Sequence, residues 1–197
     1  HQKGADPGSG TRSSLMWETL NIVKNMGLWR PKVIIWENVK NVRSKYMVHN
    51  HERYMTELKK LGYTSSFHML DARDFGLPQA RQRIFTISVL DGQDFDFDAL
   101  KQKPMQPIAN YLEDRQVDDF YTVKAPSMLR AIGKTGTIRR LPINKDYCYT
   151  ITERPDRAPG SGCLSIGNGK YRYLTEKECW RLQGYSDEDF EAAAKVS

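Results

Sequence analysis

The sequence contains little cysteine and no long hydrophobic run. Its three cysteines, Cys148, Cys163 and Cys179, are an odd number without metal-ligand spacing. This excludes a disulfide framework, gives no reason to expect a metal site, and is typical of reduced thiols in a cytosolic protein. No window approaches the roughly eighteen apolar residues of a transmembrane helix, so we expect no membrane partner. Residues 1–14 are polar and lack the apolar centre of a signal peptide.

Positive charge exceeds negative charge, and the formal net charge is +6. A basic excess favours polyanionic partners, above all nucleic acid. Charge alone does not decide this, because a protein that merely stays away from its isoelectric point shows the same excess. With 39% hydrophobic and 27% charged residues, the 197-residue chain is globular in composition and long enough for one large domain, or one medium and one small.

Residues 14–90 alternate helical and strand patterns. Apolar residues in 14–29 recur at helical spacing, and Pro31 ends that helix. The run "KVIIW" follows. Because it is short, continuous and rich in β-branched residues, we interpret it as a parallel strand buried on both faces. A second helix over about 51–61, followed by strands in "YTSSFHML" and "RIFTISVL", completes a pattern typical of an α/β sheet.

The character of the chain changes after residue 90. The stretch "DGQDFDFDALKQKPMQP" is polar, acidic and contains proline, as expected for a linker. Short segments such as "YCYTIT", "GCLSI" and "KYRYL" then lie between Gly and Pro clusters and predict a small, mainly β module. Two helices close the chain. Thr175 and Glu178 have the spacing of a capping box at the start of the first, and the second begins at Ser186.

Two groups of polar residues are candidates for chemistry. Glu37 comes directly after the strand "VIIW", and ligands of open α/β sheets bind beyond the carboxyl ends of strands. In "PQARQR", Gln79, Arg81 and Arg83 alternate, so an extended backbone points them to one side as an array of donors for phosphates or a base carbonyl. The simpler alternatives are a solvated strand end, a surface pair of arginines, or one arginine that neutralises Glu37.

The order of these motifs resembles the DNA (cytosine-5) methyltransferase family, particularly its short bacterial and phage modification type. The stretch "HQKGADPGSGTRSSLMWE" is similar to the text just after that family's catalytic Pro-Cys loop, and "PKVIIWENVKNV" resembles its Glu-Asn-Val motif. Further along, "DFGLPQARQRIFTI" resembles its Gln-x-Arg-x-Arg motif. The last match, "YRYLTEKECWRLQGYSD", is similar to the helix that follows its variable target recognition region.

The resemblance implies an α/β fold: the C-terminal part of a Rossmann-like methyltransferase sheet plus a small, mainly β target recognition domain. We expect residues 1–95 to form a partial catalytic domain and 96–185 the recognition domain. Residues 186–197 would begin a helix that leads back to the catalytic domain. We also expect the chain to be a fragment that begins after the Pro-Cys loop and ends before the last family motif.

The resemblance also implies an activity and roles. The enzyme transfers a methyl group from S-adenosylmethionine to carbon 5 of a cytosine flipped out of duplex DNA. Glu37 matches the glutamate that binds the ring nitrogen 3 and the exocyclic amine, and Arg83 matches the arginine that contacts the cytosine carbonyl. Arg81 matches a phosphate contact or a clamp on the catalytic loop. Cofactor contacts are expected from three residues, with most of that site upstream of residue 1: Leu15, Trp17 and Asn38.

Two features depart from the family. No cysteine follows a proline, so the family's nucleophile is absent and the fragment alone is expected to be inactive. The Gly-rich cofactor loop is also absent. Because Cys148, Cys163 and Cys179 lie in apparent strands, beside glycine or within a helix, we interpret all three as packing residues.

Double-stranded DNA is the expected partner. Basic residues with interleaved tyrosines in the variable region suit phosphate and base contacts, although many of them will be solvated surface. The candidate DNA-binding residues are Gln79, Arg139, Arg140, Arg154, Arg157 and Arg172. A bacterial modification system further implies a cytoplasmic enzyme and a cognate restriction endonuclease.

Two other functions remain open. The chain can be a non-catalytic DNA-binding or regulatory protein, or one subunit of a split methyltransferase, and a Pro-Cys immediately upstream of His1 would exclude the non-catalytic alternative. A related tRNA cytosine methyltransferase shares the motifs. That family has little room for a recognition domain, so the long variable region favours DNA.

Overall fold

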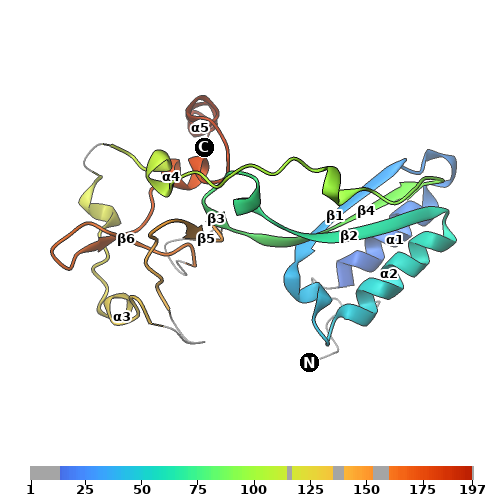
Figure 1. Cartoon of the computed structure of the whole chain (residues 1–197), viewed down its shortest axis with the longest axis horizontal. Helices are drawn as coiled ribbons and strands as arrows, with labels where there is room; N and C mark the ends of the chain where they lie inside the picture. Colours follow the sequence, from blue (N-terminus) through green and yellow to red (C-terminus); the bar gives the residue numbers. More distant parts are fainter. Residues whose placement is uncertain (1–13, 115–116, 135–139, 153–159, 197) are drawn as a thin grey trace. The chain divides into compact units, whose positions relative to one another are not determined.

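Helices and strands alternate in the first half of the chain, as predicted. The computed structural model describes residues 14–114, 117–134, 140–152 and 160–196. The helices are α1 (Leu15–Asn25), α2 (Val48–Lys60), α3 (Pro126–Leu129), α4 (Glu176–Arg181) and α5 (Asp187–Ala194) (Figure 1). The strands are β1 (Val33–Val39), β2 (Tyr63–Asp71), β3 (Gln79–Ala80), β4 (Gln82–Leu90), β5 (Cys148–Tyr149), β6 (Leu164–Ser165) and β7 (Tyr171–Arg172).

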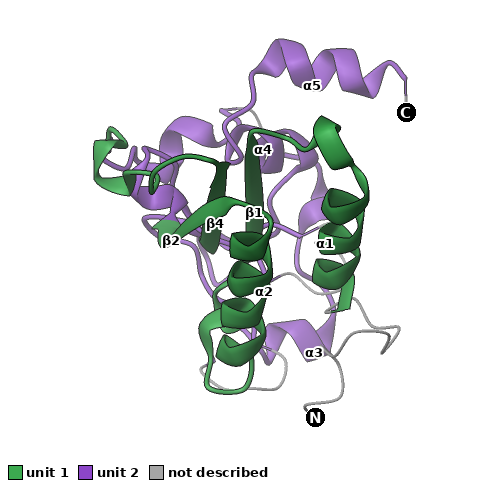
Figure 2. Cartoon of the chain, turned by 90° about the vertical axis from the view of Figure 1, so that its right-hand side faces the viewer, with its two compact units in different colours: residues 1–70, 82–101 green, residues 71–81, 102–197 purple. Residues whose placement is uncertain are grey.

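The chain divides into two units (Figure 2). Unit 1 contains residues 1–70 and 82–101, and unit 2 contains residues 71–81 and 102–197. The short segment 71–81 therefore leaves unit 1 between two of its strands and packs with residues that follow it much later in the sequence. The predicted domains 1–95, 96–185 and 186–197 concern the organisation of the whole protein and stay a prediction.

A three-stranded sheet in the order β1-β4-β2 forms the centre of unit 1. α1 and α2 lie side by side over one face of this sheet, as Figure 2 shows. The core between them contains Leu20 of α1 and Tyr54 of α2, and Ile34 and Trp36 of β1 pack against it. Removing these apolar side chains from water is the main force that holds the two layers together. Gly62 ends α2 with a φ of +92°, the left-handed conformation that its position after the helix predicts.

The prediction for β1 was wrong in two respects. β1 pairs antiparallel with β4, and only one of its faces is covered: Ile34 and Trp36 point to the helices, whereas Val33, Ile35 and Val39 are 48%, 66% and 50% exposed. A continuous apolar run does not reveal direction, and among the described residues β1 has a neighbour on one side only. Its outer face therefore remains an exposed apolar surface that also carries Glu37.

Unit 2 is built from short pieces. β3 pairs parallel with β5, β6 pairs antiparallel with β7, and each of these strands has two residues. One apolar cluster contains Leu174, Cys179 and Leu182 from the region of α4, and a second contains Leu141 and Cys163. The small module expected after the linker is thus held together mainly by loop packing, with little regular sheet.

Both closing helices begin as predicted. Thr175 accepts a hydrogen bond from the backbone N–H of Glu178, whose carboxylate accepts one from the N–H of Thr175. Ser186 and Asp189 form the same reciprocal cap at the start of α5. Each cap satisfies N–H groups that the first turn of a helix leaves without partners.

Candidate functional site

Glu37 lies near the carboxyl end of β1. It faces Phe85 of β4 across the sheet and shares its side of the strand with Ile35 and Val39, because alternate residues of a strand point the same way. Its side chain is 41% exposed. The strand therefore carries a carboxylate on the apolar outer face of the sheet, where a ligand can reach it.

Arg83 is the partner of Glu37. Arg83 lies in β4 and pairs with Val39 of β1, two positions along β1 from Glu37. Its Nε lies 3.0 Å from Oε1 of the Glu37 carboxylate. The Arg83 side chain is only 17% exposed, and its Nη1 also donates to the carbonyl of Gln82 at 2.9 Å. The structure thus brings together two residues predicted from separate motifs. It also bears out the simpler alternative, that an arginine neutralises Glu37, and the two are compatible because the carboxylate remains accessible.

The three candidate cofactor residues differ in their surroundings. Leu15 begins α1 and is 59% exposed, so it offers an apolar surface to a ligand. Trp17 is only 6% exposed, packs in the core of unit 1 and lies under the guanidinium of Arg53 at 4.9 Å. Asn38 uses its Oδ1 to accept a hydrogen bond from the N–H of Val39 at 2.8 Å. Leu15 is exposed to a ligand and Trp17 is a core residue, while Asn38 is half-buried and its Oδ1 fixes the strand end.

Gln79 and Arg81 belong to unit 2. Gln79 is 1% exposed: its Nε2 donates to the carbonyl of Leu182 at 3.0 Å, and its Oε1 accepts from the N–H of Ile151 at 3.4 Å. We therefore correct its expected role, because a buried amide with both ends bonded inside the protein cannot contact DNA without breaking the core. Arg81 is half-buried, just before β4.

Arg172 is likewise an internal residue. Its Nη1 and Nη2 each lie 2.7 Å from a carboxylate oxygen of Glu178, and Arg172 is 9% exposed. Burial alone would raise the pKa of Glu178, but hydrogen bonds from Arg172 and from backbone N–H groups leave that pKa lowered. The expected DNA contact is corrected for the same reason as for Gln79: an ion pair inside the protein occupies the side chain.

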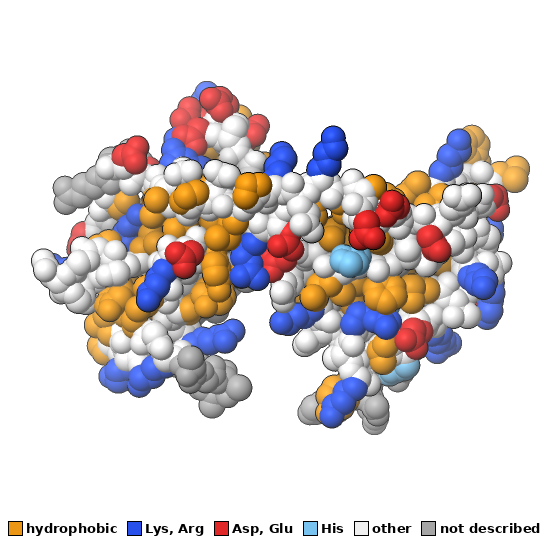
Figure 3. Space-filling view, viewed as in Figure 1, with side chains coloured by type: hydrophobic (Ala, Val, Ile, Leu, Met, Phe, Trp, Pro, Cys, Tyr) orange, Lys and Arg blue, Asp and Glu red, His pale blue; other side chains and the backbone are white. Residues whose placement is uncertain are grey.

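The remaining DNA-binding candidates divide by location. Arg140 is exposed and available. Arg139, Arg154 and Arg157 lie outside the described residues. In Figure 3, basic side chains on the visible face are interspersed with acidic and apolar ones and form no single stripe. The visible face therefore carries no uniform basic field.

The three cysteines are buried, as expected for packing residues. Cys148 and Cys163 are 0% exposed and Cys179 is 7% exposed. Burial raises the pKa of Cys148 and Cys179 to about 12 and that of Cys163 to about 11, so these thiols stay protonated at neutral pH. A protonated, inaccessible thiol is a poor nucleophile.

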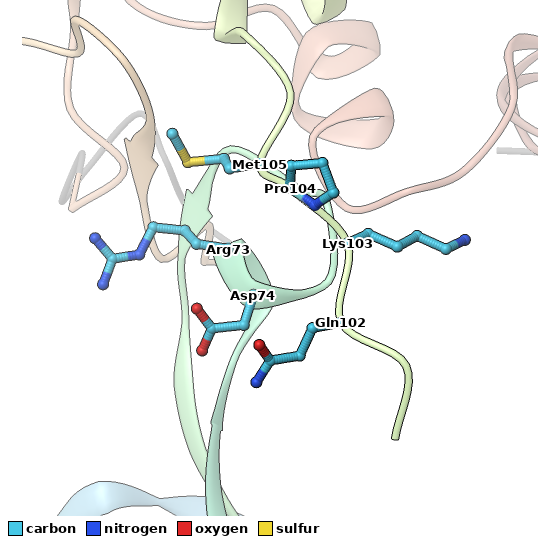
Figure 4. A pocket seen from close by; sticks show the side chains of 6 residues that line it. All are labelled: Arg73, Asp74, Gln102, Lys103, Pro104 and Met105. Carbon is cyan, nitrogen blue, oxygen red and sulfur yellow. The ribbon is translucent and has the colours of Figure 1, made fainter. Parts of the chain in front are cut away.

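Arg73 is a basic residue of unit 2 that no motif indicated. It lies in "DARD" between Asp71 and Asp74, so the stretch has a negative net charge and gives no signal of a basic site. A surface hollow of about 590 Å³ is lined by Arg73 and Asp74 on one side and by residues 102–105 on the other. Figure 4 shows these side chains pointing in different directions, so the hollow itself has no convergent set of polar groups.

The described part of the chain contains neither a metal-ligand cluster nor a membrane-spanning helix. Its His, Cys, Asp and Glu side chains form no group of three or more that is able to hold a metal ion. None of the helices there is long and apolar enough to cross a membrane.

Comparisons with known sequences agree on one family. The sequence model of the C-5 cytosine-specific DNA methylase family matches residues 1–197. The chain is 34% identical over 210 residues to the type II methyltransferase M2.ScrFI of Lactococcus lactis subsp. cremoris, covering 98% of this chain and 54% of that protein. It is 33% identical over 189 residues to M.NgoBI of Neisseria gonorrhoeae, covering 92% and 57%. The chain thus spans about half the length of the curated relatives it matches.

Solved structures show the same fold. The S. pombe Dnmt2 methyltransferase superposes with a TM-score of 0.68 at 21% identity, over 89% of this chain and 61% of that one. The Entamoeba histolytica methyltransferase EhMeth superposes with a TM-score of 0.64 at 21% identity, over 87% and 57%. At this identity the likeness concerns the fold, which confirms the predicted mixed α/β methyltransferase class.

Proposed function

This chain belongs to the C-5 cytosine-specific DNA methylase family, and we propose that it is part of an enzyme that methylates carbon 5 of cytosine in a specific site of double-stranded DNA. S-adenosylmethionine supplies the methyl group when bound. The target base leaves the helix to react, because its ring is inaccessible when stacked. The organisation expected from the sequence fits this proposal: a partial catalytic domain followed by a recognition domain.

The pairing of Glu37 with Arg83 is the observation that carries the proposal. A cytosine presents nitrogen 3 and an amine on one edge and a carbonyl oxygen beside them. The Glu37 carboxyl, when it carries a proton, hydrogen-bonds nitrogen 3 and also accepts from the amine, while Arg83 donates to the carbonyl oxygen. When a thiolate adds to carbon 6, negative charge moves onto the ring, and a proton held at nitrogen 3 offsets it.

The contact between Glu37 and Arg83 supports this proposal. Their separation of 3.0 Å fixes the carboxylate beside the guanidinium before any base arrives, so little reorganisation is needed. The Glu37 side chain is 41% exposed, so a ligand can reach it. Arg81 is proposed as a phosphate contact or a clamp on the catalytic loop, and Arg139, Arg140, Arg154 and Arg157 as DNA contacts of the recognition domain.

The described residues do not complete the enzyme. The three buried thiols are unsuited to attack carbon 6, and of the cofactor candidates Leu15 alone is exposed to a ligand. We therefore propose that the chain by itself does not turn over and that the nucleophile and most of the cofactor site are supplied from outside it. We further propose a bacterial cytoplasmic setting and a cognate restriction endonuclease.

Replacement of Glu37 tests this function. In the natural protein that contains this chain, Glu37→Gln should reduce transfer of tritium from labelled S-adenosylmethionine to DNA by about a hundredfold or more, because the amide cannot supply the proton at nitrogen 3. Glu52→Gln is the matched control, since Glu52 is 58% exposed on α2 of the same unit and should leave labelling unchanged.

Three results would contradict the proposal. Undiminished labelling by Glu37→Gln would remove the role of Glu37. A wild-type protein that binds DNA but never labels it would support the non-catalytic alternative. Label that enters tRNA in place of DNA would support a tRNA cytosine methyltransferase.

A further inference from the structure

Arg73 lies on a rigid loop of unit 2. The loop joins β2 to β3, and backbone hydrogen bonds hold it: the N–H of Ala72 donates to the carbonyl of Arg81 at 3.2 Å, and the N–H of Lys103 donates to the carbonyl of Asp74 at 2.9 Å. The N–H of Arg73 itself donates to Oδ1 of Asp71 at 3.1 Å. These bonds fix the position from which the Arg73 side chain projects.

One edge of the Arg73 guanidinium is held by Asp71. Nε lies 3.1 Å from Oδ1 and Nη2 lies 2.7 Å from Oδ2, so the contact is bidentate. A guanidinium has five N–H donors in a planar fork. Asp71 uses the Nε–Nη2 edge, and the described part of the chain offers Nη1 no hydrogen bond. The adjacent Nη1–Nη2 edge thus presents two parallel donors.

Tyr147 supports the guanidinium, and Tyr149 packs against Tyr147. The Arg73 guanidinium carbon lies 4.8 Å from the ring centroid of Tyr147, within the range of a cation–π contact, and Tyr147 meets Tyr149 edge to face at 5.7 Å. β5, which contains Tyr149, pairs with β3, so these rings are anchored to the strand that follows the Arg73 loop. The Arg73 side chain is still 33% exposed.

The direction of Arg73 separates it from the hollow that it partly lines. In Figure 4 its guanidinium points away from Lys103, Gln102 and Asp74, at the outer end of an extended side chain. The guanidinium therefore extends away from the hollow. A planar pair of donors matches two acceptors side by side, which DNA offers at the O6 and N7 atoms of guanine and at the oxygens of a phosphate.

We propose that Arg73, held by Asp71 and supported by Tyr147, is a DNA-contacting residue that binds such a pair of acceptor atoms through its Nη1–Nη2 edge. The inference rests on the proposed function, because it needs duplex DNA as the partner. It adds a residue outside the motifs that the sequence indicated. A contact to guanine would make Arg73 a specificity-determining residue, and a contact to phosphate would make it a positioning residue.

Binding measurements on the natural protein that contains this chain test the assignment. Bisulfite sequencing of a plasmid that the protein has modified gives the methylated site. A labelled duplex carrying that site is then titrated with wild type, Arg73→Gln and Arg73→Lys at several salt concentrations. We expect Arg73→Gln to bind about tenfold more weakly, and Arg73→Lys to restore little, because lysine lacks the planar fork.

Two arms identify the acceptor. If Arg73 reads guanine, replacing guanines by 7-deazaguanine weakens wild type but not Arg73→Gln, and the loss is confined to duplexes that carry one particular guanine. If it binds phosphate, Arg73→Gln loses affinity equally on all duplexes and the slope of log affinity against log salt falls by about 1. Either pattern supports the assignment.

Further variants separate this contact from general effects. Lys195→Gln removes one positive charge from the end of the acidic helix α5 and should bind like wild type. Tyr147→Leu should weaken binding less than Arg73→Gln, and Tyr147→Phe should not weaken it, because Phe keeps the ring.

The outcomes distinguish two failures. If wild type binds and methylates DNA while Arg73→Gln matches it in affinity and salt slope, then the Arg73–Asp71 pair is only structural and this inference fails alone. If wild type neither binds nor methylates DNA, the proposed function fails as well.

Discussion

Each unit contains an arginine paired with a glutamate, and the two pairs differ in almost every physical respect. In unit 1, Arg83 meets Glu37 through a contact of 3.0 Å on an open sheet face, with side chains 17% and 41% exposed. In unit 2, Arg172 donates two hydrogen bonds of 2.7 Å to the Glu178 carboxylate, and the two side chains are 11% and 0% exposed. Identical functional groups thus occur once at a surface and once in a core.

Exposure decides what each pair does. A surface ion pair contributes roughly 0–1 kcal/mol because water and salt screen it. A buried pair contributes little net stability over a hydrophobic one but is costly to break, because removing one partner leaves an uncompensated charge. The Glu37 pair therefore contributes little to stability, whereas the Glu178 pair holds the backbone of residues 113 and 175 in place.

Breaking both pairs should show the largest difference. Glu178→Gln should lower the free energy of unfolding by about 3–5 kcal/mol, because Arg172 stays buried without its counter-charge. Glu37→Gln should change it by less than about 1 kcal/mol. Urea unfolding followed by tryptophan fluorescence and circular dichroism measures both values. Comparable losses from the two variants would show that burial does not distinguish the pairs.

A lower pH should destabilise unit 1 more than unit 2, by a smaller free energy than the difference between the two ion pairs. His51 of unit 1 is 0% exposed, and its ring bonds Thr86 at 2.8 Å and Arg43 at 3.3 Å. Burial, assisted by the charge of Arg43, lowers the pKa of His51 to about 4 from 6.5. The folded state therefore binds this proton less readily than the unfolded state. The stability that neutral His51 contributes is complete above pH 6.5 and is lost as the pH falls towards about 4.

This loss should reach about 3 kcal/mol at pH 4 and should be confined to unit 1. Glu178 of unit 2 has a lowered pKa, so its contribution persists until the pH falls below the ordinary range of a glutamate. Hydrogen exchange of the two units between pH 7 and 4.5 measures the difference. His51→Asn should reduce the change in stability of unit 1 with pH. His49→Asn, at an exposed position of the same helix, should leave that change as it is. Equal pH responses of both units would contradict the assignment to His51.

The contrast between the pairs also shows what local sequence patterns can reveal. Glu37 and Arg83 were predicted because each stands at a fixed place relative to an apolar strand, and strand pairing then made them neighbours. The capping box of Thr175 and Glu178 was predicted because it depends on a local spacing of three residues.

The errors arose where distant segments decide the environment. Gln79 bonds to Leu182, which lies 103 positions away, and no pattern near Gln79 reveals that contact. Arg172 was interpreted as a surface cation because the sequence indicated only one role for Glu178, that of a helix cap. Glu178 also forms the buried ion pair with Arg172. Arg73 was overlooked for the opposite reason: its neighbouring aspartates hide a guanidinium that is partly exposed. The antiparallel direction of β1 was likewise a property of the strand that pairs with it.

The two capping boxes of unit 2 give the smallest expected difference. Thr175 is 4% exposed, and its hydroxyl also donates to a carboxylate oxygen of Glu113 at 2.8 Å, whereas Ser186 caps α5 in an exposed position. Thr175→Ala should therefore lower the free energy of unfolding by about 1–2 kcal/mol and Ser186→Ala by about 0.5 kcal/mol. Thr175→Ser retains the hydroxyl and should recover most of the first loss. Equal losses of unfolding free energy from Ser186→Ala and Thr175→Ala would show that the cap hydrogen bond alone decides the stability. Burial, which distinguishes Glu178 from Glu37, would then matter less than we infer.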